Sequence, residues 1–232
     1  MMIRSQHSSQ HRFVAKSMAG RLSRRELIGR GLALGLSVPT ISALLAARPD
    51  EALAVGGGTM KIAYTLDLQF LDPQLVQSDQ DLLPSTLIFG RLVQWDATML
   101  DPKPDVAASW TISPDNLTYV FTLRPGVKFH SGRDVTADDV VFSFQRALDT
   151  GDKGRGKAEL RDVESFKATG PLEFTVKLTQ PSAVFMTSCG HWALPILNKD
   201  TVADIATAPD GTGPFKFGEW IPGDHANYKK NP

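Results

Sequence analysis

The first 54 residues place the strongest limit on what this chain can fold into, because they have the three-part pattern of an export signal. A basic stretch is followed by an apolar run that begins just after Arg24 and Arg25, and the segment ends in small residues at Ala54. This order is typical of a cleaved signal peptide. We therefore expect cleavage after Ala54 and folding of residues 55–232 outside the cytoplasm.

The pair Arg24 and Arg25 directly ahead of the apolar run indicates export by the twin-arginine translocase. Leu27 stands where that pattern more commonly has Phe, so the general secretory route stays open as an alternative. Arg30 and Pro39 interrupt the apolar run, whereas a membrane-spanning helix needs about 20 mostly apolar residues. An uncleaved anchor or an amphipathic surface helix is the other interpretation of this segment.

Charge and cysteine content narrow the classes further. Lys+Arg and Asp+Glu are equal at 25 each, which gives no reason to expect nucleic acid as a partner. Cys189 is the only cysteine, so an internal disulfide is impossible. Residues 55–58, a Val followed by three Gly, predict a flexible leader before the folded part.

Alternation of apolar and polar residues predicts strands at residues 60–64, 118–123 and 172–178. In the second of these, Tyr119 and Phe121 fall on one face. Turns are expected on either side of it, at residues 114–116 and 124–126, because Pro, Asp, Asn and Gly favour turn conformations.

Helices are expected at residues 81–92 and from Thr136 onward. Thr136 is a suitable N-cap, and Asp138 and Asp139 suit the positive end of the helix dipole. Apolar residues at helical spacing from Val140 onward predict one buried stripe. Residues 150–157 are rich in Gly, Lys and Asp and are interpreted as a loop.

The sequence contains no recognisable catalytic or metal-binding pattern. His7 and His11 leave with the signal peptide, and no pair among His130, His191 and His225 has metal-ligand spacing such as HxxxH. Residues 211–214 lack the Lys-Ser/Thr of a phosphate-binding loop. Asp138 and Asp139 are adjacent on a helix and therefore face different directions, which favours capping over catalysis. Cys189 near His191 is the one conceivable nucleophile and base. We predict no enzyme activity, no cofactor and no metal site.

Six motifs in order resemble family 5 of the extracellular solute-binding proteins, the periplasmic receptors for dipeptides, oligopeptides and nickel that serve ABC importers. One of them, FGRLV, resembles the family's "yegLv". The resemblance covers residues 59–232, with Ser131 in place of a usual Asp. The motifs are LDP at 71–73, FGRLV at 89–93, PDVAASW at 104–110, residues 115–132, TADDV at 136–140, and GTGPFK at 211–216.

The resemblance implies an α/β fold like that of the type II periplasmic binding proteins, with a mixed-sheet lobe and an inserted subdomain. Residues 59–89 and 181–232 would belong to lobe I, and residues 90–180 would form the subdomain packed on it. Family members are considerably longer, so the second lobe is expected beyond Pro232. Hinged closure of two lobes around a solute is the implied mechanism.

The resemblance also implies candidate ligand contacts in two loops. The loop formed by Ser78, Asp79 and Gln80 corresponds to a segment that contacts ligand in relatives, while Trp192 could stack on a ligand and His191 could donate a hydrogen bond. The motif residues, with Trp110, Phe121 and Phe129 among them, are interpreted as fold determinants.

The implied function is capture of a peptide or similar small solute in the periplasm and delivery to ABC permease subunits. A receptor for nickel or a metal chelate on the same fold is an alternative, and so is a truncated fragment without function. A secreted enzyme would need a catalytic constellation that the sequence lacks.

Overall fold

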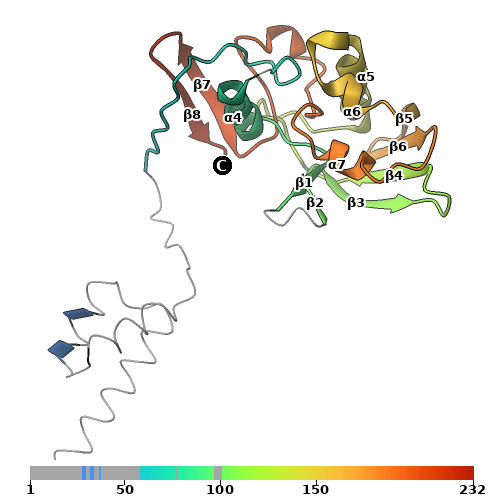
Figure 1. Ribbon diagram of the computed structural model, residues 1–232, viewed down its shortest axis with the longest axis horizontal. Helices are drawn as coiled ribbons and strands as arrows, with labels where there is room; N and C mark the ends of the chain where they lie inside the picture. The colour runs from blue at the N-terminus through green and yellow to red at the C-terminus, as the bar shows by residue number, and fades with distance from the viewer. Residues whose placement is uncertain (1–27, 30–31, 34–36, 38–57, 77, 97–100) are drawn as a thin grey trace, which may run out of the picture. The chain divides into compact units, whose positions relative to one another are not determined.

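The computed structural model describes residues 28–29, 32–33, 37, 58–76, 78–96 and 101–232. The predicted signal peptide, with Arg24, Arg25 and Ala54, lies outside these residues apart from five scattered positions. The chain divides into two units, residues 1–62 and 63–232, and the fold described below is that of the second (Figure 1). In the part of the chain that is described, no helix has the length and apolarity to cross a membrane.

An antiparallel four-stranded sheet in the order β3-β4-β6-β5 is the largest sheet of this unit (Figure 1). It confirms the strands predicted at residues 118–123 and 172–178. Within it, Phe121 lies opposite Phe174, and Tyr119 lies opposite Val176, so these side chains share one buried face. The strands are β3 (Ala107–Ile112), β4 (Thr118–Leu123), β5 (Val163–Gly170) and β6 (Glu173–Leu178).

Both predicted turns beside β4 are present. Asn116 has a φ of 58° and Gly126 a φ of 77°, which is the left-handed region that these two residue types tolerate best. The Asn116 N–H donates to the Ser113 carbonyl at 2.9 Å, and the Ser113 N–H donates to the Thr118 carbonyl at 2.9 Å. These bonds fix the β3–β4 connection and with it the register of the sheet.

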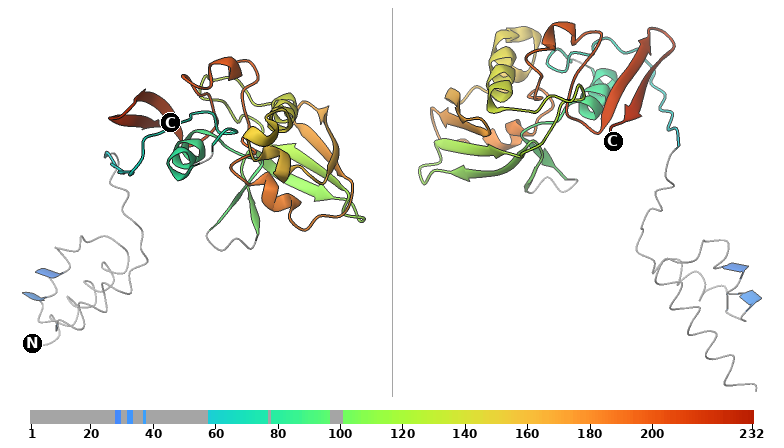
Figure 2. Two further views of the ribbon diagram at one scale, coloured as in Figure 1. Left: turned by 45° about the horizontal axis from the view of Figure 1, so that its top comes forward. Right: turned by 180° about the vertical axis from the view of Figure 1, so that it is seen from behind.

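Helix α5 (Ala137–Asp149) covers the buried face of the sheet (Figure 2). Its Phe144 packs edge-on against Phe174 and Phe166, with ring centroids 5.0 and 5.7 Å apart. The predicted start is confirmed, because Thr136 precedes the first turn and the Asp139 carboxylate accepts its backbone N–H at 2.9 Å. Asp139 is fully buried and pairs with Arg133 at 2.5 Å.

A second apolar cluster joins helix α4 (Asp79–Ile88) to the hairpin of β7 (Phe215–Ile221) and β8 (His225–Lys230). The loop at residues 211–214 lies against the end of α4, where the Gly213 N–H donates to the Ile88 carbonyl at 2.7 Å. A Cβ on Gly213 would lie 2.4 Å from the Leu87 carbonyl oxygen, so this close approach requires glycine. The cluster contains Ile88, Phe89, Leu197 and Ile205, with Phe142, Val202, Phe217 and Tyr228 packed against it.

The remaining elements are short. Strands β1 (Val93–Trp95) and β2 (Pro102–Pro104) form a separate antiparallel pair. Helix α7 (Phe185–Cys189) packs on the buried face of the large sheet, where Phe185 meets Tyr119 edge-on at 4.8 Å. A 3-10 turn, η2, spans Val202–Asp204.

Three sequence expectations need correction. No strand forms at residues 60–64, which take part in no strand pairing of the described structure, and the side chains of Met60, Ile62 and Tyr64 stay exposed. The helix expected at 81–92 is α4, which begins at Asp79 and ends at Ile88 before the chain turns into β1. Residues 150–157 include the 3-10 turn η1 (Gly151–Lys153) and the start of helix α6 (Gly156–Glu159) and are not a plain loop.

Candidate functional site

The predicted loop at residues 78–80 lies at the start of α4. Ser78 is the residue before the helix, and its hydroxyl donates to the carboxylate of Asp81. That buried carboxylate also accepts the backbone N–H groups of Gln69 and Phe70 at 2.6 and 3.1 Å. Ser78 is therefore held by the fold, Gln80 is half-buried in the first turn, and the side chain of Asp79 lies outside the described part.

The second predicted pair, His191 and Trp192, directly follows α7. The two rings lie 5.0 Å apart at an interplanar angle of 34°, and both side chains are half-buried. Within the described ranges, no hydrogen bond, ion pair or ring contact joins them to Ser78 or Gln80. The structure thus gives two separate groups of candidate contacts and not one joined group.

Cys189 is unsuited to act as a nucleophile. Its thiol is buried, and that burial raises its pKa far above the usual range. The thiolate is the reactive form, so the side chain is inert at neutral pH. The conceivable pairing of Cys189 with His191 has no supporting contact among the described side chains.

His191 is positioned as a hydrogen-bond donor. Its Nδ1 accepts the backbone N–H of Ala193 at 3.3 Å, so the neutral ring carries its proton on Nε2. Burial lowers the pKa of His191, the nearby carboxylate of Glu159 raises it, and the charges of Arg155 and Arg91 lower it, with a net lowering. The Glu159 Oε1 lies 3.7 Å from Nδ1. The Nε2–H has no partner among the described residues.

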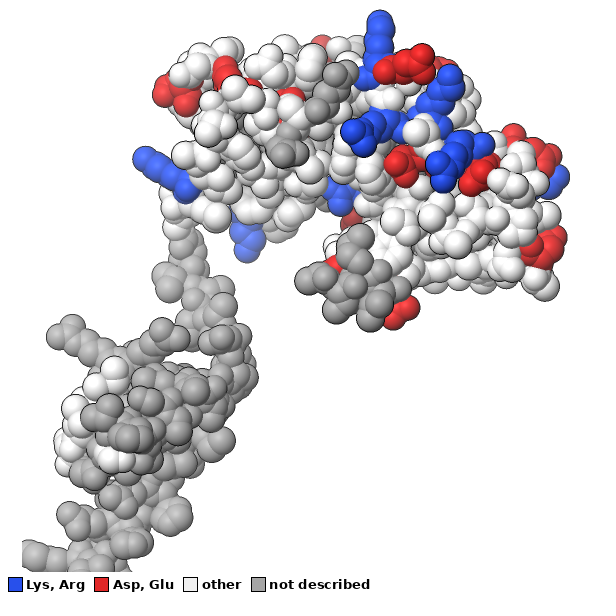
Figure 3. Space-filling model, in the orientation of Figure 1, with Lys and Arg blue, Asp and Glu red and all other residues white. Residues whose placement is uncertain are grey.

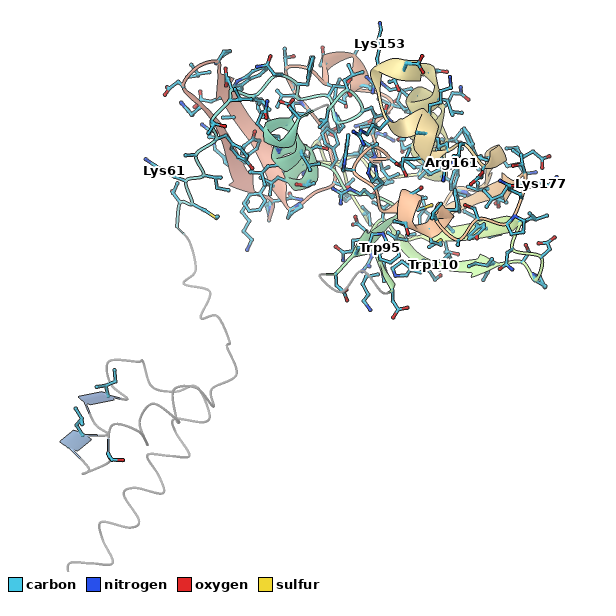
Figure 4. All side chains as sticks on the ribbon, viewed as in Figure 1. Lys61, Trp95, Trp110, Lys153, Arg161 and Lys177 are labelled. Carbon is cyan, nitrogen blue, oxygen red and sulfur yellow. The ribbon has the colours of Figure 1, made fainter. Side chains whose placement is uncertain are left out.

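Trp95, the last residue of β1, lies beside the segment that contains His191. The position that a Cβ on Gly190 would take is 2.4 Å from Trp95 Nε1, so the indole lies directly against the residue before His191. Figure 4 labels Trp95 at the end of β1. The Trp95 Nε1 is buried and has no hydrogen-bond partner in the described structure. We call Trp95, Glu159, His191 and Trp192 the His191 cluster.

The positive charge of Arg91 acts on the cluster by lowering the pKa of His191. The Arg91 Nε is buried without a hydrogen-bond partner among the described residues, and burial lowers the pKa of its guanidinium while Asp105 raises it. Sequence reasoning missed Arg91, Trp95 and Glu159. The available signal was the arginine of the FGRLV motif.

A surface pocket of about 350 Å³ lies elsewhere, between the turn at residues 130–132 and β7. Its polar groups are largely bonded to one another. The Asp210 carboxylate accepts the Ser131 hydroxyl at 2.7 Å and the Thr201 hydroxyl at 3.3 Å, and Lys216 Nζ donates to the His130 carbonyl at 3.0 Å. Ser131, which departs from the family pattern, thus takes a structural role. The polar residues that line this pocket therefore stabilise the fold.

No cluster of three or more His, Cys, Asp or Glu side chains suited to a metal ion occurs within the described residues. The His191 cluster offers one histidine and one carboxylate, beside two N–H donors and a stacking ring. Such a set can orient a polar solute by hydrogen bonds and aromatic contact.

Comparison with known proteins assigns the fold to a family. Residues 101–232 match the model for bacterial extracellular solute-binding proteins, family 5 middle. The chain is 33% identical over 211 residues to the probable D,D-dipeptide-binding periplasmic protein of Escherichia coli, covering 84% of this chain and 40% of that protein. It is 33% identical to the probable di/tripeptide-binding protein 5 of Pseudomonas aeruginosa, covering 63% and 33%. The chain thus spans two fifths or less of these relatives.

Solved structures of other binding proteins share the fold of this chain. The periplasmic binding protein DppA of Helicobacter pylori, in complex with the peptide STSA, has a TM-score of 0.65 at 31% identity, covering 72% of this chain and 38% of that one. NikZ of Campylobacter jejuni, in complex with Ni(L-His), has a TM-score of 0.63 at 29% identity, covering 71% and 34%. These likenesses confirm the predicted α/β fold of the type II periplasmic binding proteins and show that a part of it is present here.

Proposed function

Because the chain belongs to family 5 of the bacterial extracellular solute-binding proteins, we propose that it forms part of a receptor that captures a peptide or similar small solute for an ABC importer. The observation that carries this proposal is the His191 cluster. It sets a half-buried aromatic ring beside an imidazole N–H that has no partner among the described residues, while the side chains of the family motifs stabilise the fold.

The motif residues support a division between scaffold and site. Gly213 closes on α4, and Asp72 of the LDP motif pairs with Arg146 of α5 at 2.5 Å. Phe121 and Phe129 are buried in the core, and Trp110 packs against it. These contacts leave the family motifs little freedom to bind a solute, so ligand contacts fall to loops such as 191–192.

The proposed receptor uses residues 59–89 and 181–232 as the present part of lobe I and residues 90–180 as the subdomain packed on it. A solute held at the His191 cluster would be enclosed by hinged closure of a second lobe. The Ser78, Asp79 and Gln80 group would contribute through Gln80 and Asp79, since the Ser78 hydroxyl is engaged by Asp81.

Location and partners follow from the same proposal. The signal peptide at residues 1–54 would direct export through the twin-arginine translocase, with cleavage at Ala54. The E. coli relative and DppA of H. pylori are periplasmic binding proteins, which supports a periplasmic location. The loaded receptor would then deliver its solute to the ABC permease subunits in the membrane. No catalytic step is proposed, since the thiol of Cys189 is buried.

A receptor for a metal chelate is the second candidate. It is favoured by the similarity to the C. jejuni protein solved with Ni(L-His) and by an imidazole and a carboxylate lying 3.7 Å apart in the cluster. Two ligating groups are too few for a metal site built by this chain alone, so the chelator would supply the remaining ligands.

Native mass spectrometry of the purified chain with an equimolar mixture of dipeptides and tripeptides tests the proposal. We expect bound peptide in the wild-type protein, loss of binding in Trp192→Ala, and retention in the matched variant Trp192→Phe, which keeps an aromatic face. Binding of Ni(L-His) in place of every peptide would favour the second candidate. Peptide binding that is equal in all three proteins would refute the assignment of the site.

A further inference from the structure

His130 joins the turn at residues 130–132 to the chain that leads into β7. Its backbone N–H donates to the Gly211 carbonyl at 2.8 Å, and its ring Nε2 lies 2.9 Å from the Gly213 carbonyl oxygen. Lys216 Nζ donates to the His130 carbonyl at 3.0 Å. The ring and the Gly213 carbonyl belong to residues 83 positions apart in the sequence, so one histidine connects two distant parts of the chain.

Ser131 adds two further bonds to this contact. Its N–H donates to the Asp210 Oδ1 at 2.9 Å, and its hydroxyl donates to Oδ2 at 2.7 Å. The side of the contact that leads into β7 is held by α4, because the buried Gly213 donates its N–H to the Ile88 carbonyl at 2.7 Å. Ser131 and Gly132 are exposed, so the turn is the side that is free to move away. We call these bonds of His130 and Ser131 the 130–216 joint.

The ring of His130 has room for one proton in this joint and not for two. A carbonyl oxygen can only accept, so Nε2 carries the proton of the neutral ring. The other nitrogen, Nδ1, is buried and has no hydrogen-bond partner among the described residues. Protonation would place an N–H and a positive charge at Nδ1, shielded from water and without an acceptor, which is costly. The closed joint therefore requires the neutral imidazole.

The charged groups around His130 do not remove this cost. Burial lowers the pKa of its ring, Asp210 raises it and Lys216 lowers it, with a net lowering. Asp204 of η2 lines the same pocket, but it is exposed to water, which screens its charge. Arg133, which follows the turn, is a further cation, and its guanidinium is paired with a carboxylate of α5. On the face that Figure 3 shows, Lys and Arg atoms gather over α5 and α6, and few lie over α4, β7 and β8.

We propose that the 130–216 joint is a pH-sensitive contact, closed while His130 is neutral and released when a proton binds its Nδ1. On release, the turn at residues 130–132 separates from the start of β7 and widens the pocket of about 350 Å³ that both segments line. The inference does not depend on the proposed receptor function. Within the proposed receptor, the joint connects the subdomain of residues 90–180 to the part of lobe I at residues 181–232.

Proton linkage gives the sign and the size of the effect. The pKa of His130 is lower in the closed joint than in the released turn, where the ring meets water. The closed joint is therefore fully stable above about pH 6.5, the ordinary pKa of a histidine. From there down to the pKa of the closed joint, each pH unit shifts the equilibrium about tenfold toward the released turn. Below that pKa the shift ends, because the ring is then protonated in both states.

Hydrogen exchange of backbone amides in the full chain measures the joint, because the N–H groups of His130 and Ser131 both donate within it. We expect the protection of these two amides, corrected for the intrinsic exchange rate at each pH, to fall about tenfold per pH unit below pH 6.5. The fall should end at the pKa that the ring C–H signals of His130 report by NMR. The Leu123 amide, which donates to the Leu172 carbonyl at 2.7 Å, should stay more strongly protected at every pH, since it exchanges only through a larger opening.

His130→Gln keeps an N–H donor for the Gly213 carbonyl and does not titrate, so protection at positions 130 and 131 should no longer depend on pH in this range. His225→Gln is the matched control, since it removes an exposed histidine on β8 and should respond like the wild type. Far-UV circular dichroism checks that the variants fold. If His130→Gln does not fold, the coincidence of protection loss with the titration of the His130 ring in the wild type remains the test.

Three results would overturn the proposal. Protection at His130 and Ser131 that is constant with pH in the wild type means that the joint does not respond to the proton. A pH response that persists in His130→Gln assigns the effect to another group, such as Asp210. Protection at Leu123 no greater than at Ser131 means that the joint opens only when the whole chain unfolds.

Discussion

Replacing Asp139 by Ala tests whether the buried ion pair at the start of α5 holds the scaffold together. The carboxylate has no exposed surface, whereas the Arg133 side chain is 29% exposed. It accepts two guanidinium hydrogen bonds, and its Oδ2 also accepts the backbone N–H and the hydroxyl of Thr136, both at 2.9 Å. The substitution therefore removes an ion pair and a helix cap together.

The expected loss can be built from these contacts. Breaking one partner of a buried ion pair costs about 3–5 kcal/mol, and a helix cap contributes about 1 kcal/mol. The first value is reduced here, because Arg133 keeps Asn198 at 2.9 Å and Asp200 at 3.1 Å as partners and is partly exposed to water. We expect Asp139→Ala to lower the free energy of unfolding by about 3 kcal/mol, out of a typical total of about 5–15 kcal/mol.

Urea unfolding followed by far-UV circular dichroism gives the free energy directly. The matched control is Asp138→Ala, one residue earlier on the same helix. Its carboxylate is 68% exposed and pairs with Lys199 at only 3.7 Å, so its loss should cost about 1 kcal/mol or less. A cost for Asp139→Ala below that of Asp138→Ala would refute the argument that the buried pair stabilises this helix start.

Three further predictions concern single residues. Gly213→Ala should destabilise the chain by about 1–3 kcal/mol, because the new Cβ would lie 2.4 Å from a backbone oxygen. The control Gly170→Ala, whose new Cβ would have its closest contact at 3.5 Å, should cost less than about 1 kcal/mol. Equal urea midpoints for the two variants would contradict the close packing at Gly213. Burial lowers the pKa of His130 below its unfolded value, so the contribution of the neutral imidazole to stability is complete above about pH 6.5 and is lost as the pH falls through the folded pKa. The wild type should therefore lose more stability between pH 7 and pH 5 than His130→Gln. Parallel pH profiles of stability for the two proteins would contradict this. Cys189 should not react with a thiol reagent in the folded chain at neutral pH and should react fully in urea, and rapid labelling of the folded chain would contradict its burial.

The elements that local patterns specify fully are those that the sequence predicted best. Strands β4 and β6 alternate strictly, and their buried residues fall on the predicted face, because a period of two leaves only one way to bury them. The start of α5 was predictable because a capping residue and an acidic first turn lie within four residues of one another.

The failures share a dependence on contacts from distant parts of the chain. Alternation at residues 60–64 shows which side chains could be buried, but it does not supply a neighbouring strand. The short helix α6 was missed because its first residue, Gly156, gains its place by packing against α5, where a Cβ would lie 2.6 Å from that of Ala147. The amino-acid composition around Gly156 does not indicate that contact.

The candidate site divides in the same way. His191 and Trp192 could be proposed because they follow one another in a segment of known family position. Arg91 and Trp95 are separated from them by nearly a hundred residues, and only the tertiary structure brings β1 against the end of α7. The burial of the Arg91 Nε without a hydrogen-bond partner among the described residues is likewise a property of the packing, which no spacing in the sequence could indicate.

The most direct test of the receptor proposal is the melting temperature of the chain with and without a mixture of dipeptides and tripeptides. A ligand that binds only the folded state at about 100 times its dissociation constant adds about 2.7 kcal/mol to the free energy of unfolding. We predict a concentration-dependent rise in the wild-type protein and none in Trp192→Ala. A melting temperature that no peptide changes at any concentration would contradict the proposal that this chain carries a solute site.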